Sequence, residues 1–145
     1  MNKKLYVTYL ILSILGFITS LYLTIQHFIE SQGACDINAA ISCSLVNSST
    51  YSEIFGVPIA IFGMLWFMAL FLLAWNYFHK KSQKQDKMLL YWNYLGFLAV
   101  IYLITAEVWL RAICPFCTVV HVIVLLSLGL SIYISRKSSF PPIIK

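Results

Sequence analysis

Two cysteines, Cys114 and Cys117, stand in a Cys-Pro-Phe-Cys motif where a long apolar run begins. Residues three apart share one face of a helix, so the two sulfurs can close a disulfide or open to a dithiol. Unpaired N–H groups and the positive dipole end at a helix start favour the thiolate, and Pro115 suits the first helical turn. We interpret the motif as redox-active, with a structural disulfide or half of a zinc site as the alternatives.

A second pair, Cys35 and Cys43, lies in a polar stretch rich in serine and asparagine. A pair on a mobile loop could swing between an external partner and a fixed site, although a structural clip fits the residues equally well. Two pairs permit a relay in which disulfides pass along through mixed disulfides. A zinc site made of all four thiolates is the competing interpretation, and outside the cell it competes with oxidation.

His121 lies four residues after Cys117 and seven after Cys114, so the three share a helix face. The chain contains no haem, flavin or dinucleotide motif, but membrane quinones take two electrons and two protons, as one dithiol releases on oxidation. His121 could donate a hydrogen bond to a quinone carbonyl or pass a proton. A histidine whose hydrogen bonds are made to a neighbouring helix is an equally good interpretation, although ionisable groups within a span are functional candidates.

The amino-acid composition excludes several classes of protein. The 145 residues are 61% hydrophobic and 10% charged, whereas soluble chains carry about 25% charged residues. A water-soluble domain is therefore excluded, and so is intrinsic disorder, which needs low hydrophobicity. A nucleic-acid binder is not indicated, because the positive charge is spread over short segments between apolar runs.

Four apolar runs are long enough to cross about 30 Å of hydrocarbon. They cover residues 5–29, 56–78, 88–109 and 117–134. The first is too long for a cleaved signal peptide. The sequence predicts an all-α integral membrane protein: a four-helix bundle in one domain, 1–145, with a long loop, 30–55, between the first two helices.

Lysine and arginine predict the orientation. Of the 10 such residues, all except Arg111 fall at the termini or in the connection 79–87, which marks the cytoplasmic side. Both termini are thus expected in the cytoplasm. All four cysteines are expected on the opposite, oxidising side, where disulfides persist.

Four further residues receive structural predictions. Glu107 and Arg111 stand at i and i+4 near the end of the third run and are predicted to form an interfacial ion pair. Gly96 and Gly129 are predicted to permit close helix packing. His27 is predicted to be a residue of the membrane interface.

The motifs follow a definite order along the chain. A cysteine pair in the first outward loop is followed by Ser49, by Phe55-Gly56-Val57-Pro58 and Gly63, and finally by the Cys-X-X-Cys motif. This order resembles the vitamin K epoxide reductase (VKOR) family, in its bacterial form without a fused thioredoxin-like domain, over nearly the whole chain. The DsbB family performs similar chemistry on four helices but carries its Cys-X-X-Cys in the first outward loop.

The resemblance implies a membrane thiol oxidase. Cys114 and Cys117 would be the active-site pair, with Cys117 nearest the quinone, and Cys35 and Cys43 would carry electrons from a DsbA-like thioredoxin-fold partner. The acceptor would be a quinone of the menaquinone, ubiquinone or vitamin K type, and the setting a bacterial cytoplasmic membrane.

The resemblance also implies a quinone site near the outer surface, partly covered by the segment 51–55. Its expected residues are His121, Ser49 and Phe55, with Ser49 also ordering the loop. Vertebrate members carry a tyrosine where this chain has His121, which puts the quinone selectivity in doubt. The alternative to the enzyme is a four-span membrane protein whose cysteines form structural disulfides or hold a metal.

Overall fold

The computed structural model describes residues 3–29, 35–79 and 83–139. It contains four long helices, α1 (Lys3–Ile29), α3 (Ile59–His79), α4 (Gln83–Leu110) and α5 (Pro115–Ser139). Between α1 and α3 lie a short helix α2 (Cys43–Asn47), a 3-10 turn η1 (Thr50–Ser52) and two strands, β1 (Glu53–Ile54) and β2 (Val57–Pro58). All four long helices are apolar enough to span a membrane, which confirms the predicted architecture.

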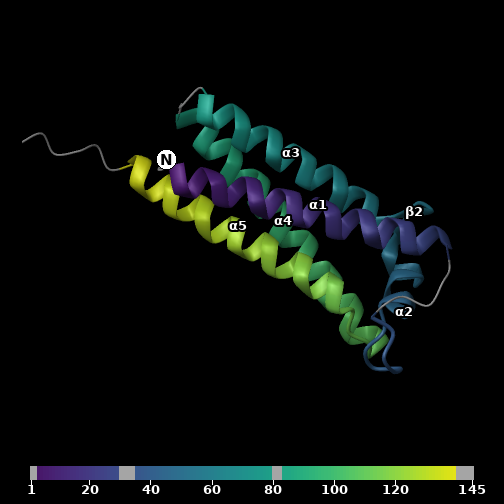
Figure 1. The fold of residues 1–145 in the computed structure, drawn as a ribbon. Helices are drawn as coiled ribbons and strands as arrows, with labels where there is room; N and C mark the ends of the chain where they lie inside the picture. The colour runs from purple at the N-terminus through teal and green to yellow at the C-terminus, as the bar shows by residue number, and fades with distance from the viewer. Residues whose placement is uncertain (1–2, 30–34, 80–82, 140–145) are drawn as a thin grey trace, which may run out of the picture.

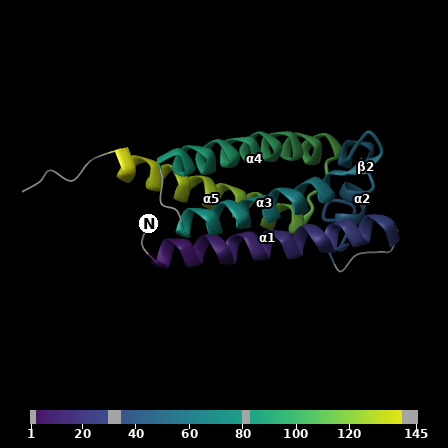
Figure 2. The ribbon, with the colours of Figure 1, turned by 90° about the horizontal axis from the view of Figure 1, so that it is seen from above.

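The helices form one bundle whose functional residues gather at one end. Figure 1 shows the start of α1 and the end of α5 together at one end, and α2 and the β-hairpin at the other. Figure 2 shows α1 and α4 at opposite edges of the bundle, with α3 and α5 between them. The long first connection is therefore a cap on the end of the bundle where α5 begins.

The helix ends differ from the predicted ones for local reasons. α4 begins at Gln83, five residues before the apolar run, because glutamine and lysine are good helix formers and can extend a helix beyond hydrocarbon. α3 begins only at Ile59, since Phe55 and Gly56 have φ of 54° and 76° and turn the β1–β2 hairpin.

Close packing between the helices depends on small residues, because lipid tails are as apolar as the side chains they would replace. Gly16 lies under the ring of Phe67, and Gly96 lies against the ring of Trp66, so a side chain at either glycine would collide with an aromatic ring. The predicted role of Gly96 is confirmed. The same prediction for Gly129 is wrong, since a Cβ there would meet no atom within 4 Å.

Polar groups also join the helices. The Tyr9 hydroxyl on α1 donates to the Ser127 carbonyl on α5 at 2.6 Å. Across α3 and α4, the indole N–H groups of Trp66 and Trp92 each donate to the other residue's carbonyl, at 3.3 and 3.2 Å. These bonds hold the bundle together while its outer surface keeps apolar side chains, such as Leu98, exposed for lipid.

The described part of the first loop is docked against the start of α5. The Ser42 N–H donates to the Ile113 carbonyl at 3.2 Å, and the Ile113 N–H donates to the Ala40 carbonyl at 2.9 Å. Asp36 accepts the Ser42 hydroxyl at 2.7 Å and the Ser44 N–H at 3.0 Å. This part of the loop is held by backbone bonds, which favours a fixed position over the swinging one that the sequence left open; residues 30–34 lie outside the described part.

Candidate active site

Cys114 is the residue that caps the N-terminus of α5. Its carbonyl accepts the Thr118 N–H at 2.9 Å, and its Sγ accepts the Cys117 N–H at 3.2 Å. A side chain that accepts the N–H three residues on is the usual arrangement of an N-cap. The sulfur thus lies at the positive end of a 25-residue helix, where a thiolate is favoured.

The surroundings favour the ionised form of Cys114. A hydrogen bond from the Cys117 thiol lowers the pKa of Cys114, and the backbone N–H groups of Cys117 and Phe116 act in the same direction. Burial and the negative charge of Glu107 oppose them, but the net pKa lies below the usual thiol value. Cys114 is therefore suited to be the attacking or leaving sulfur in exchange.

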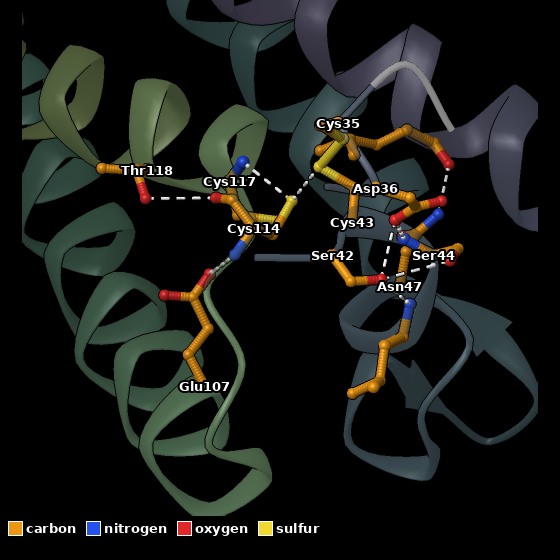
Figure 3. Close-up of a disulfide and its surroundings, with 12 residues drawn as sticks. Cys35, Asp36, Ser42, Cys43, Ser44, Asn47, Glu107, Cys114, Cys117 and Thr118 are labelled. Carbon is orange, nitrogen blue, oxygen red and sulfur yellow. Dashed lines mark hydrogen bonds between the residues drawn. A yellow bond between two sulfur atoms is a disulfide. The ribbon is translucent and has the colours of Figure 1, made fainter. Parts of the chain in front are cut away.

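The two cysteine pairs meet at Cys43. Cys35 and Cys43 form a disulfide, and the Cys114 thiol donates to the Cys43 sulfur at 3.0 Å. Figure 3 shows the Cys114 sulfur between Cys117 on one side and the disulfide on the other. Both Cys43 and Cys114 are fully buried, so disulfide exchange between them needs no movement of the loop.

Cys117 opens onto a large apolar cavity. The cavity has a volume of about 610 Å³ and is lined by residues from all four long helices and from the cap. Polar atoms near Cys117 come from His121, Asn47 and Ser52. The His121 Nε2 atom is buried and has no hydrogen-bond partner among the described residues, which is costly unless a ligand supplies one.

A comparison with protein families agrees with this arrangement. The model of the vitamin K epoxide reductase family matches residues 7–132. The chain belongs to this family. Its members are membrane oxidoreductases of the disulfide-relay type. Among curated proteins, none matches the chain.

In this VKOR family member, the cap is fastened to the bundle through His27. The His27 Nδ1 atom lies 2.7 Å from the Asn47 carbonyl, and Nε2 lies 3.2 Å from a carboxylate oxygen of Glu53. Ser52 donates to the same Asn47 carbonyl at 2.5 Å. His27 is thus more than the predicted interface residue, because it holds two segments that cover the cavity.

The other two predicted quinone-site residues lie in different surroundings. Ser49 lines a second, small cavity together with Cys117 and Glu107, and its hydroxyl donates to the Val46 carbonyl at 2.7 Å. The Phe55 side chain is fully exposed at the tip of the hairpin and lines neither cavity. The structure brings His121 and Ser49 beside Cys117 and does not bring Phe55 there, since the hairpin turn directs it outward.

The site includes a residue that the sequence did not assign to it. The Glu107 Oε1 atom accepts the Cys114 N–H at 3.3 Å, and within the described residues no ion pair joins Glu107 to Arg111. The predicted pair is wrong because Arg111 has a φ of 51°, which ends α4 before the i+4 geometry is completed. The only signal in the sequence was the spacing of seven residues between a carboxylate and the first motif cysteine.

Proposed function

We propose that this protein is a thiol oxidase that passes electrons from a DsbA-like thioredoxin-fold partner to a membrane quinone, and so supports disulfide formation in secreted proteins. The observation that carries the proposal is the 3.0 Å contact between the Cys114 thiol and the Cys43 sulfur of the loop disulfide. This contact joins the cysteine pair of the cap, Cys35 and Cys43, to the motif pair, Cys114 and Cys117, of which Cys117 lines the large cavity.

The internal transfer has two steps. After the partner's dithiol has reduced the loop pair, the Cys43 thiolate attacks Cys114 of an oxidised Cys114–Cys117 pair and expels the Cys117 thiolate. Cys35 then attacks Cys43 and expels Cys114. Two electrons have moved, the loop disulfide has re-formed and the motif is a dithiol, which is the covalent state described here.

The burial of Cys43 supports one order of events in the loop. Its side chain is fully buried against Cys114, whereas Cys35 keeps 6% of its surface exposed. We therefore infer that the partner attacks Cys35, the more accessible of the two sulfurs, and that the Cys43 thiolate is the group released toward Cys114.

The large cavity supports a quinone as the acceptor. Its apolar lining and volume of about 610 Å³ suit a lipid-soluble ring, and the unpartnered His121 Nε2 can donate to a ring carbonyl. A bound quinone of the menaquinone, ubiquinone or vitamin K type supplies an acceptor for two electrons and two protons. Ser49 stays near Cys117 in this proposal, whereas Phe55 is outside the binding set.

Charge supports the proposed orientation in a bacterial cytoplasmic membrane. Among the described residues, all lysines and arginines except Arg111 belong to the start of α1, the start of α4 or the end of α5, and such residues stay in the cytoplasm. The four cysteines are at the other end. They would face the oxidising compartment in which a DsbA-like partner works.

Quinone reduction by the purified protein in detergent, with a reduced DsbA-like protein as the electron donor, tests the proposal. We expect turnover in the wild type and none in Cys117→Ala or Cys43→Ala. A small dithiol that reaches the motif directly should restore turnover to Cys43→Ala alone. The proposal is wrong if the wild-type protein reduces neither ubiquinone nor menaquinone and its disulfide resists dithiols. The cysteines would then have a structural role only.

A further inference from the structure

A small second cavity also touches Cys117, and His121 does not line it. Its volume is about 20 Å³, which is room for one water molecule. Its wall is mostly apolar, and its polar residues are Ser49, Ser52, Tyr51, Glu107 and Cys117. These residues supply the few polar atoms that a water held there would need as partners.

Glu107 lies beside both cysteines of the motif. Its side chain is 9% exposed, and Oε1 accepts the Cys114 N–H at 3.3 Å. Its own carbonyl accepts the Ala112 N–H at 3.2 Å, which fixes the chain that leads from α4 into α5. The carboxylate is thus anchored to Cys114 and shares a cavity with Cys117.

Few other charged or titratable groups face this carboxylate. On α5 they are the two motif cysteines, and on η1 the half-exposed Tyr51 lines the same cavity. Arg111, directly after α4, is exposed, and α2 contributes only Val46 to the cavity. Within the part of the chain that the structure describes, Glu107 is the only carboxylate that lines either of the two cavities.

Oxidation of the motif requires that its two thiols lose two protons as well as two electrons. The helix start favours the thiolate of Cys114, but Cys117 lies within the first turn and its sulfur has no such cap. His121 lines the large cavity, where the acceptor would bind. A proton acceptor for Cys117 in the small cavity would leave the large cavity free for the electron acceptor.

We propose that Glu107 positions Cys114 through its N–H and accepts the proton of the Cys117 thiol through a water in the small cavity. The S–H bond of Cys117 breaks, the water passes a proton to the carboxylate, and the thiolate remains on Cys117. When the Cys114–Cys117 bond forms, the two thiolates give up two electrons. A bound quinone would take these electrons with two protons: the one held by the Glu107 carboxyl group and one from water, which replaces the proton that Cys114 released when it ionised. This role rests on the proposed quinone reduction.

Glu107→Gln is the decisive variant, because the amide oxygen can still accept the Cys114 N–H while the group no longer takes a proton. We expect quinone reduction to fall by roughly 100-fold at pH 7, the size of a lost acid–base group. The remaining rate should rise steadily with pH, without the acidic limb that protonation of the carboxylate gives the wild type. Thr105→Ala, an exposed change on the same helix, should retain wild-type turnover.

The ultraviolet absorbance of the Cys114 thiolate separates this role from a purely electrostatic one, and it can be followed although Cys114 is fully buried. The charge of Glu107 opposes the Cys114 thiolate, so this thiolate should form at lower pH in Glu107→Gln. A thiolate that forms at lower pH together with slower turnover supports proton transfer. Equal thermal unfolding of the two proteins in detergent excludes a folding defect.

Full turnover with an unchanged pH profile in Glu107→Gln would overturn the role of Glu107 and leave the oxidase proposal standing. A wild-type protein without turnover would instead overturn the oxidase proposal, and the role that rests on it.

Discussion

Cys114 has two tasks that usually belong to different residues. It caps α5 with its side chain, as serine or aspartate does in most helices, and it is the sulfur that contacts both the loop disulfide and Cys117. Because the capping bonds act on the sulfur itself, helix formation and thiolate stabilisation are one interaction. The start of α5 therefore determines both the position and the reactivity of the thiol.

The lowered pKa of Cys114 predicts its pH dependence. The thiolate absorbs in the ultraviolet more strongly than the thiol, so a lower pKa moves the midpoint of the absorbance–pH curve to lower pH. In the wild type, with the loop disulfide closed, we expect this midpoint below that of an ordinary thiol. The hydrogen bond from the Cys117 thiol lowers the pKa of Cys114 more than any other contact. Cys117→Ala removes this bond and should move the midpoint upward.

A pH titration of the thiolate absorbance measures this midpoint, and it requires no reagent to reach the buried sulfur. Ser48→Ala, an exposed change in the cap, is the matched control and should leave it where it is. Identical midpoints in the wild type and Cys117→Ala would show that the neighbouring thiol does not stabilise the thiolate.

Among single residues, the sequence identified those whose type alone indicates a chemical role. The four cysteines and His121 stand out by type and spacing, and the structure places His121 in the cavity beside Cys117. Which of the two loop cysteines contacts Cys114 was not predictable, because this depends on backbone hydrogen bonds around Ile113 that have no side-chain signature. The bond from Glu107 to Cys114 arises in the same turn and was hidden for the same reason.

Among the elements, the junction between α4 and α5 matters most for the site. α4 ends with the Arg111 N–H bonded to the Val108 carbonyl and the Ala112 N–H bonded to the Glu107 carbonyl. This is a Schellman motif, which places one residue in the left-handed conformation. That residue is usually glycine, whereas here it is Arg111 with a φ of 51°.

The junction predicts opposite effects of two substitutions at Arg111. A side chain in the left-handed region costs roughly 1–2 kcal/mol, and glycine avoids most of this cost. We expect Arg111→Gly to raise the free energy of unfolding by about 1 kcal/mol. Arg111→Val should lower it, because β-branched residues tolerate positive φ poorly.

Thermal unfolding in detergent, followed by circular dichroism, measures both changes. Arg111→Lys keeps the charge and the backbone strain and should unfold like the wild type. If the glycine variant unfolds earlier than the valine variant, the left-handed conformation of residue 111 is not what limits this junction.

The long helices were predictable, and the small elements of the cap were not. Apolar runs of 20 residues have no soluble alternative, so α1, α3, α4 and α5 follow from hydropathy. α2, η1, β1 and β2 have between two and five residues, too few for any periodic pattern to show. The tie from His27 to Asn47 and Glu53, which fastens the cap, therefore had no signal in the sequence.

For the whole molecule, the bundle is a scaffold that brings distant segments together at one end. Cys43 and Cys114 are 71 residues apart in sequence, and two helices and their connections separate them. The docked loop makes the relay a fixed contact. Electrons would then pass from the cap to the membrane cavity through touching sulfurs, without the carrier arm that the polar loop suggested.

Trapping this contact as a covalent bond tests directly whether electrons pass from Cys43 to Cys114. The double variant Cys35→Ser, Cys117→Ser leaves only Cys43 and Cys114, and mild oxidation followed by non-reducing peptide mapping should find them joined by a disulfide. The matched variant Cys35→Ser, Cys114→Ser leaves Cys43 and Cys117 and should remain largely unjoined. No bond in the first variant, or equal yields in the two, would contradict the path from Cys43 to Cys114.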